Sequence, residues 1–151
     1  MNDFIALKGK LHKCCIDYVN NRLHNIQTAM ASLSESANDE TKSSVGDKHE
    51  TGRTMAQLEQ EKLSYQLMDV QKQQMILNSR SFELITHKIK TGSLVLTNNG
   101  NYYLSISAGK VCIDKQDYFA VSVESPIGMA LVEATNSFSF NGKEYRILKV
   151  G

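Results

Sequence analysis

The chain has 151 residues, of which 41% are hydrophobic, and its 17 basic and 16 acidic residues leave a formal net charge of +1. This length allows one ordinary domain or two small ones, and the balanced charge does not indicate a surface that binds nucleic acid along its whole extent. No apolar run approaches 18 residues, and the N-terminal stretch MNDFIALKGKLHKCC lacks the features of a signal peptide. We therefore expect a cytoplasmic protein without a membrane span.

The first half of the chain has the composition and spacing of two long helices. We expect one helix from about residue 4 to about residue 34 and another from about 48 to about 78, because apolar side chains recur at steps of three and four. Neither helix would be stable alone in water, so the two should bury their apolar sides against each other as an antiparallel coiled coil. The apolar positions are Leu7, Leu11, Cys15, Val19, Leu23, Ile26, Met30 and Leu33 in the first helix, and Ala56, Gln60, Leu63, Leu67, Val70, Gln74 and Leu77 in the second.

An acidic, polar stretch near residues 35–50 is the expected tip of this hairpin. It contains Asp47 and Glu50, whose spacing places both carboxylates on the same side of a helical turn. One interpretation is structural, with Asp47 as the N-cap and Glu50 at the third helical position of a capping box. The other is chemical, because carboxylates at the end of a long hairpin can enter a cavity in another protein and help to hold Mg²⁺.

The second half alternates β-branched and aromatic residues with polar ones, which is typical of strands. We expect a small, mostly antiparallel sheet with one short helix, and hence an α+β chain. Pro126 suits the first turn of that helix, and both Asn98-Asn99-Gly100 and Asn141-Gly142 indicate tight turns. The expected strands cover residues 85–98, 101–107, 111–113 and 118–123, and two more lie within 137–150.

The chain has no motif for a self-contained active site. It lacks a nucleotide-binding glycine motif, a C-x-x-C pair and an H-E-x-x-H pair. His12, His24, His49 and His87 have no partner at metal-ligand spacing, so we expect surface histidines and no metal site in the isolated protein. Three cysteines, two of them adjacent, argue against a disulfide framework and are expected to be reduced.

Two motifs resemble those of the bacterial Gre-type transcript cleavage factors. Gly46-Asp47-Lys48-His49-Glu50 is similar to the G-D-x-x-E tip signature of that family. Residues 121–150, which contain Ser125-Pro126-Ile127-Gly128, are similar to its S-P-[IL]-[AG] segment, helix and closing strands. The order of helical hairpin and globule also agrees, so the similarity of plan covers nearly the whole chain. One departure is Thr51-Gly52, where the family typically has Asn-Ala.

The resemblance implies a coiled-coil hairpin over residues 1–80 and an FKBP-like domain over residues 81–151 that docks on RNA polymerase at the rim of the secondary channel. Asp47 and Glu50 would then help to bind the second Mg²⁺ of the polymerase, which cleaves backtracked RNA. The chain would be a monomeric stimulator of that reaction rather than an enzyme, with no cofactor of its own and with room for indirect contact with nascent RNA. The residues implied at the polymerase-docking surface are Ser125, Pro126, Ile127 and Gly128.

Three other interpretations remain open on the sequence alone. A secondary-channel protein can regulate or inhibit RNA polymerase without stimulating cleavage. An FKBP-like fold can carry peptidyl-prolyl isomerase activity, which needs an aromatic-lined pocket, although fold alone does not carry function. A simple dimerising coiled coil would leave Asp47 and Glu50 as no more than a capping box.

Overall fold

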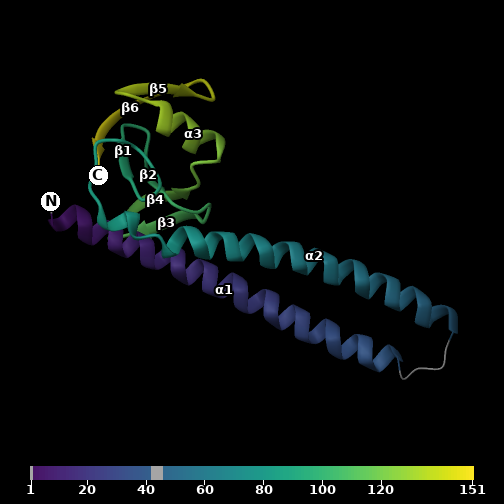
Figure 1. Ribbon diagram of the computed structural model, residues 1–151. Helices are drawn as coiled ribbons and strands as arrows, with labels where there is room; N and C mark the ends of the chain where they lie inside the picture. The colour runs from purple at the N-terminus through teal and green to yellow at the C-terminus, as the bar shows by residue number, and fades with distance from the viewer. Residues whose placement is uncertain (1, 42–45) are drawn as a thin grey trace. The chain divides into compact units, whose positions relative to one another are not determined.

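The computed structural model describes the backbone of residues 2–41 and 46–151 and the side chains of residues 3–35, 52–79 and 82–151. Two long helices precede a six-stranded sheet, and a short helix lies between its fourth and fifth strands in chain order (Figure 1). The chain is therefore α+β, as the sequence predicted. The elements are α1 (Asn2–Thr41), α2 (Gly46–Asn78), the 3₁₀ helix η1 (Arg80–Glu83), β1 (Leu94–Thr97), β2 (Gly100–Leu104), β3 (Gly109–Ile113), β4 (Gln116–Val121), α3 (Pro126–Glu133), β5 (Ser137–Phe140) and β6 (Lys143–Val150).

The chain forms two compact units. Unit 1 consists of Met1–Tyr18 together with Gln74–Gly151, and unit 2 consists of Val19–Gln73. Helix α2 ends at Asn78, and the first strand follows only at Leu94. The compact units do not follow a division at residue 80, because the start of α1 and the end of α2 are grouped with the sheet. Among the described residues, no helix combines the length and the apolar character that a membrane crossing requires.

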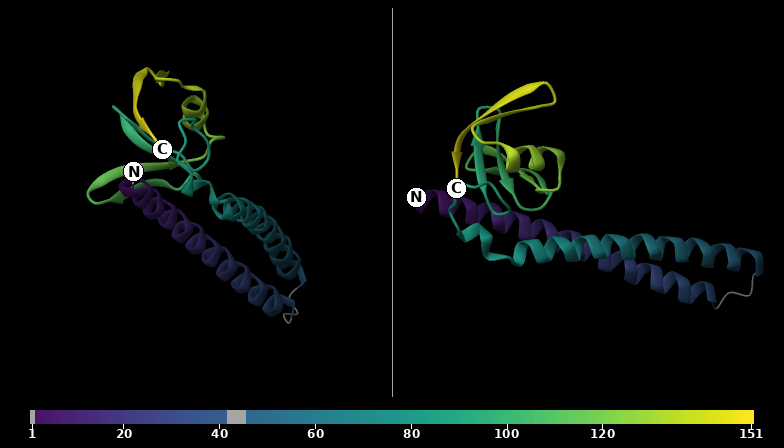
Figure 2. Two further views of the ribbon diagram at one scale, coloured as in Figure 1. Left: turned by 60° about the vertical axis from the view of Figure 1, so that its left-hand side comes forward. Right: turned by 45° about the horizontal axis from the view of Figure 1, so that its top comes forward.

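Unit 2 is a helical hairpin in which α1 and α2 run antiparallel (Figure 2). Its buried side chains, Val19 and Ile26 on α1 and Leu63 and Val70 on α2, belong to the predicted apolar positions. Arg22 also joins the two helices, because its Nη1 donates to Asp69 Oδ2 and to Gln73 Oε1, each at 2.8 Å. The first helix is longer than predicted and continues to Thr41.

Unit 1 contains the sheet, whose strand order is β3-β4-β2-β1-β6-β5. The paired strands are antiparallel except for β2 and β4, which are parallel with Tyr103 opposite Ala120. Asn141 and Gly142 form a two-residue hairpin turn with φ of 51° and 77°, and this turn was predicted. Asp114 and Lys115 form a second such turn, at φ 50° and 67°, which the sequence analysis did not identify.

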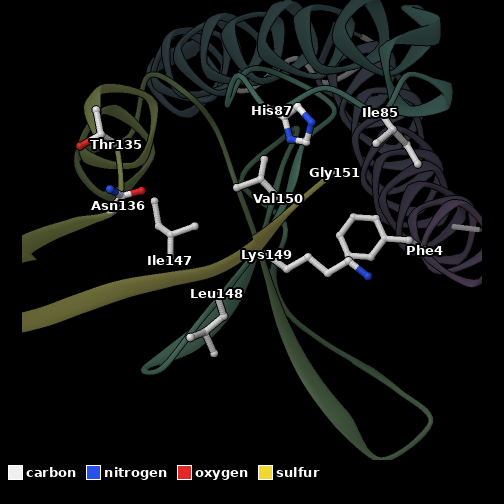
Figure 3. Close-up of a pocket in the computed structure, with 10 residues that line it drawn as sticks. All are labelled: Phe4, Ile85, His87, Thr135, Asn136, Ile147, Leu148, Lys149, Val150 and Gly151. Atoms are coloured by element: carbon white, nitrogen blue, oxygen red, sulfur yellow. The ribbon is translucent and has the colours of Figure 1, made fainter.

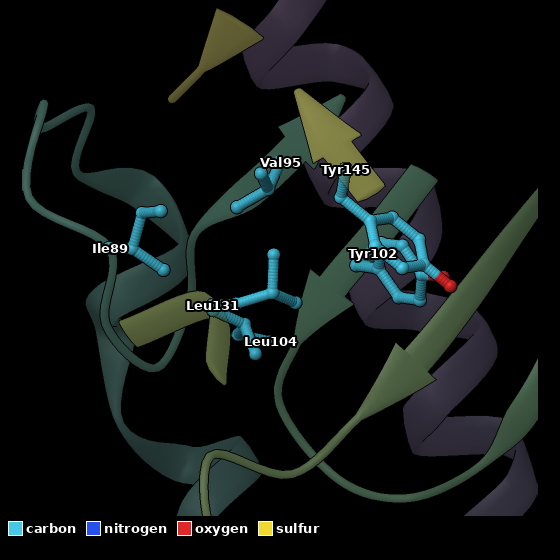
Figure 4. Packing of buried hydrophobic residues seen from close by; sticks show 6 residues of the cluster. All are labelled: Ile89, Val95, Tyr102, Leu104, Leu131 and Tyr145. Atoms are coloured by element: carbon cyan, nitrogen blue, oxygen red, sulfur yellow. The ribbon is translucent and has the colours of Figure 1, made fainter. Parts of the chain in front are cut away.

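The two faces of the sheet carry different cores. Leu104 and Val95 on one face pack with Leu131 of α3, and Tyr102 approaches Tyr145 edge to face with ring centroids 6.3 Å apart (Figure 4). Leu94 and Tyr103 are paired across β1 and β2 and lie on the opposite face, where Tyr103 meets the first part of α1. Unit 1 therefore has helix on both faces of its central strands.

The prediction of a strand over residues 85–98 is wrong for its first part. Strand β1 begins only at Leu94, and the residues before it form turns and irregular backbone. Gly92 adopts a φ of 95°, and the Lys90 backbone nitrogen donates to Ser93 Oγ, so the chain bends here instead of extending. Ile89 still anchors the bend, because its side chain is buried in the core on the α3 side.

Candidate functional site

The two predicted tip acids lie in the first turns of α2. The helix is described from Gly46, which places Asp47 in its first turn. Residue 45 and the side chain of Asp47 lie outside the described residues, so the capping box stays a prediction. Asp47 and Glu50 are three residues apart on helical backbone, but their side chains lie outside the described residues. The same holds for Asp39 and Glu40 near the end of α1. The metal-assisting role of Asp47 and Glu50 stays a prediction.

The four predicted docking residues form the start of α3. Ser125 is the N-cap, and its Oγ accepts a hydrogen bond from the Gly128 backbone nitrogen at 3.1 Å. The same Oγ donates to the Ser122 carbonyl oxygen at 2.6 Å, and Pro126 occupies the first turn. This geometry satisfies backbone groups that would otherwise be free at a helix start. Ser125 and Pro126 therefore have a structural role whatever else they do.

Gly128 is fixed by close packing against the preceding loop. A Cβ atom at this position would lie 1.9 Å from the Ser122 carbonyl oxygen and 2.9 Å from Ser125 Oγ. No side chain fits without moving the backbone. Ile127 is partly buried and packs against the core cluster on the α3 side.

The outer side of α3 is the part of this motif region that faces solvent. Met129 is 53% exposed and Val132 is 40% exposed, and with the exposed Pro126 they follow the three-residue spacing of one helix face. We call these three residues the outer face of α3. If this segment docks on a partner, the contact falls mainly on this face. The sequence analysis missed Met129 and Val132, although their spacing from Pro126 could have indicated them.

A buried polar cluster joins α1 to the rest of unit 1. Lys8 is fully buried, and its Nζ donates to the Leu84 carbonyl oxygen at 2.7 Å. Burial, and then the charge of Lys90, lowers the pKa of Lys8 from 10.5 to about 8. Because its amine is enclosed and hydrogen-bonded, Lys8 has a structural role, which is to connect α1 to the segment that follows η1.

His12 and Cys15 complete this cluster. The His12 ring stacks on Phe82 with centroids 4.1 Å apart, and its Nδ1 lies 3.4 Å from Tyr103 Oη. Burial lowers the pKa of His12, while a backbone hydrogen bond and the charge of Glu83 oppose this shift. Burial also raises the pKa of Cys15 to about 12, which makes this thiol unreactive. The expectation of a surface position is wrong for His12 and is confirmed for His24 and His87, whereas the side chain of His49 lies outside the described residues.

Unit 1 also has an open pocket of about 430 Å³ beside β6 (Figure 3). Its lining mixes aliphatic and polar side chains, and Lys149 lies with Nζ 4.7 Å from the centroid of the Phe4 ring. The only ring side chains among its lining residues are Phe4 and His87, so this pocket is not the aromatic-lined site that an isomerase needs. The lining residues are Phe4, Ile85, His87, Thr135, Asn136, Ile147, Leu148, Lys149, Val150 and Gly151.

Metal ligands do not gather in the part of the chain whose side chains are described, where no group of three or more His, Cys, Asp or Glu could hold an ion. No protein-family model matches this chain, and no match was found among curated proteins or solved structures.

Proposed function

We propose that this chain is a Gre-like factor that binds RNA polymerase at the secondary channel and stimulates the polymerase's own cleavage of backtracked RNA. The observation that carries the proposal is the G-D-x-x-E motif in the first turns of α2, in a chain whose two long helices precede an α+β unit. In this proposal Asp47 and Glu50 reach the active site of the polymerase and supply oxygen ligands to its second Mg²⁺. That ion would orient and activate the attacking water.

The dimensions and polarity of α2 support this proposal. A helix of 33 residues is about 50 Å long at 1.5 Å per residue, which suits a probe that enters a deep channel. Asp47 and Glu50 lie at its N-terminal end, where the helix macrodipole favours negative charge. The same position would therefore favour the start of α2 in the free protein and offer the two carboxylates to a metal in the complex.

In the same proposal, unit 1 would supply the docking surface through the outer face of α3, and its sheet would be a variant of the FKBP-like domain. The support is the capped start of α3, in which Ser125 and Gly128 hold Pro126 at the surface. Residues of this face are apolar and exposed, as the centre of a protein interface requires. Ile127 and Gly128 would act indirectly by holding α3 in place.

One feature favours a second candidate function, that of a secondary-channel regulator without cleavage activity. Gly52 lies in α2 two residues after Glu50, where the family typically has Ala. A glycine inside a helix costs about 1 kcal/mol of helix stability relative to alanine. A looser N-terminal end of α2 would place the two carboxylates less accurately and weaken metal binding more than channel binding.

The decisive experiment measures RNA cleavage by stalled, backtracked bacterial RNA polymerase in Mg²⁺. Asp47→Asn/Glu50→Gln should abolish stimulation while binding to polymerase persists. A matched control is Asp17→Asn/Glu59→Gln, which removes the same charge at two exposed positions outside the tip. Binding without stimulation by the wild type would establish the regulator, and absence of binding would refute both candidates. Gly52→Ala should increase stimulation if the loosened turn is the limiting feature.

Docking is tested separately with Met129→Glu, which places a charge on the outer face of α3. We expect at least a tenfold loss of affinity for RNA polymerase, because a charged side chain would be buried in the contact. The control is Leu148→Glu on β6, where the exposed fraction is similar at 59%. Equal losses in the two variants would exclude α3 as the docking surface.

A further inference from the structure

The pocket beside β6 is formed entirely within unit 1 by parts of the chain that are distant in sequence (Figure 3). Its volume of about 430 Å³ falls within the range of small-molecule sites, about 300–1,000 Å³. Helix α1 supplies Phe4, and the segment after η1 supplies Ile85 and His87. The remaining walls come from residues 135–136 and 147–151. A hollow of this size, enclosed by one compact unit, is suited to a small ligand.

Three polar side chains at this pocket have no partner in the protein. Thr135 and Asn136 are exposed between α3 and β5, and His87 is exposed between η1 and β1. None of the three side chains forms a hydrogen bond or an ion pair within the part of the chain whose side chains the structure describes. Their polar groups are therefore available to a molecule bound in the pocket.

The backbone of Val150 adds a donor that strand pairing leaves unused. Gly151 exchanges two backbone hydrogen bonds with Leu94, and successive residues of a strand direct their backbone groups to opposite sides. The N–H of Val150 therefore points away from β1. Strand β5 does not cover that side of Val150, because it begins at Ser137, which pairs with Arg146. The pocket thus has a backbone donor as well as polar side chains.

The charges at the pocket favour an anion over a cation. Lys149 lines the pocket, and no Asp or Glu is among the described residues that do so. The ammonium of Lys149 lies 4.7 Å from the centroid of the Phe4 ring, so it occupies the aromatic face on which a cationic ligand would otherwise rest. A bound cation would meet a like charge at this place, whereas a carboxylate would form an ion pair.

We propose that this pocket binds a small organic acid with an aliphatic body. The carboxylate of the ligand pairs with Lys149, and its hydrocarbon part packs on Ile85, Ile147 and Val150. The polar side chains at the pocket and the backbone N–H of Val150 provide further hydrogen-bonding groups. The pocket involves neither the acids in the first turns of α2 nor the outer face of α3, so this inference does not rest on the proposed function.

The first test titrates the isotope-labelled full chain with sodium octanoate and follows the backbone amide signals by NMR. Saturable shifts should gather at residues 85–87, 135–136 and 147–151, with a dissociation constant of roughly 1 mM. Octylamine has the same chain length with a positive charge, and octanol has no charge, so both should bind at least fivefold more weakly. Shifts that gather elsewhere, no saturable shifts, or equal binding of octylamine would overturn the proposal.

The second test removes the positive charge at the pocket. Lys149→Met retains an unbranched side chain beside the Phe4 ring, should raise the dissociation constant of octanoate at least fivefold, and should remove its advantage over octanol. The matched control is Lys143→Met, because Lys143 is an exposed residue of the same strand and does not line the pocket. This control should bind octanoate as the wild type does. Equal weakening in the two variants would mean that no specific ion pair forms.

The third test removes part of the apolar wall. Ile85→Ser should raise the dissociation constant of octanoate at least threefold, because the hydrocarbon chain loses a surface on which to pack. Leu84→Ser is the matched control, since Leu84 is 55% exposed, adjacent in sequence and outside the pocket lining. The spectra of both variants should keep the dispersed signals of a folded sheet. If Ile85→Ser binds octanoate no more weakly than Leu84→Ser, the hydrocarbon body does not lie in this pocket and the proposal is wrong.

Discussion

His12 and Tyr103 are 91 positions apart in the chain, yet His12 Nδ1 lies 3.4 Å from Tyr103 Oη in the interior of unit 1. The contact joins the N-terminal part of α1 to the central strand β2, and Phe82 covers the other side of the histidine ring. A neutral imidazole fits this site, since burial lowers the pKa of His12. We therefore expect the free energy of unfolding of unit 1 to depend on pH on both the acid and the alkaline side, through the buried side chains of α1.

Acidification should destabilise unit 1 through His12. Its pKa is lower in the folded chain than the ordinary 6.5, so the unfolded chain binds more protons and the free energy of unfolding falls as pH falls below about 6.5. His12→Phe retains a ring to stack on Phe82 and should flatten this part of the pH profile. Urea unfolding between pH 7.5 and pH 5 measures it. The exposed His24→Gln serves as control and should leave the slope unaltered.

The contribution of Lys8 to stability should increase as the pH is raised. Its pKa of about 8 lies below the 10.5 of the free side chain, so between these values the unfolded chain holds more protons and the free energy of unfolding rises with pH. Relative to Lys8→Met, the wild type should gain about 3 kcal/mol over this range, at 1.36 kcal/mol per pKa unit. The shift of Cys15 opposes this above pH 9, but it is present in both proteins and cancels. A difference that does not change with pH would contradict the prediction.

Gly128→Ala should be strongly destabilising, because its Cβ would lie 1.9 Å from the Ser122 carbonyl oxygen. We expect a loss of about 3 kcal/mol in the free energy of unfolding, since backbone must move. Gly9→Ala is the matched control in α1, where a Cβ meets no atom within 4 Å. That change should stabilise by about 0.5–1 kcal/mol, because alanine loses less backbone entropy than glycine. Thermal unfolding of both variants gives the two values, and equal signs would refute the packing argument.

Arg22→Ala should weaken the hairpin of unit 2 by about 0.5–1 kcal/mol. The guanidinium contacts both Asp69 and Gln73 and is partly buried. Water therefore screens its interaction energy less than that of a fully exposed ion pair. A double-mutant cycle with Asp69→Ala measures the coupling from the loss of helical circular dichroism on heating. The pair of Lys10 and Asp114, at 3.3 Å and more exposed, should show a coupling near zero. A larger coupling energy for Lys10 and Asp114 than for Arg22 and Asp69 would show that solvent exposure does not determine the strength of these ion pairs.

The fold was largely predictable because its signals are local. Apolar residues at helix spacing identified α1 and α2, and Asn141-Gly142 identified a hairpin, since both residues tolerate positive φ. Asp114 and Lys115 form the same kind of turn without a glycine, so the sequence lacked the residue pair by which such a turn is usually predicted. Similarly, the positive φ of Gly92 interrupts extended backbone before β1. The alternation of apolar and polar residues, on which the longer strand was predicted, does not show this bend.

The environment of the polar side chains was not predictable in this way. Lys8 and His12 lie on a helix that reads as amphipathic, and only the approach of Tyr103 and Leu84 from distant parts of the chain buries them. Conversely, Ser125 and Gly128 were singled out by motif, and the structure gives both a local role in starting α3. Sequence reasoning finds elements better than contacts, because a contact between distant residues depends on the whole fold.

Unit 1 is assembled from both ends of the described chain, with unit 2 lying between them in sequence. Residue 151 pairs with Leu94 through two backbone hydrogen bonds, and a Cβ on Gly151 would meet the ring of Phe4 at 2.2 Å. Contacts between such distant residues slow folding, whereas the hairpin needs only neighbouring turns. During synthesis on the ribosome, α1 and α2 can therefore pair early. The part of α1 that belongs to unit 1 can bury its apolar side only after the strands of the sheet have been synthesised. Until then this side stays exposed to solvent and to chaperones.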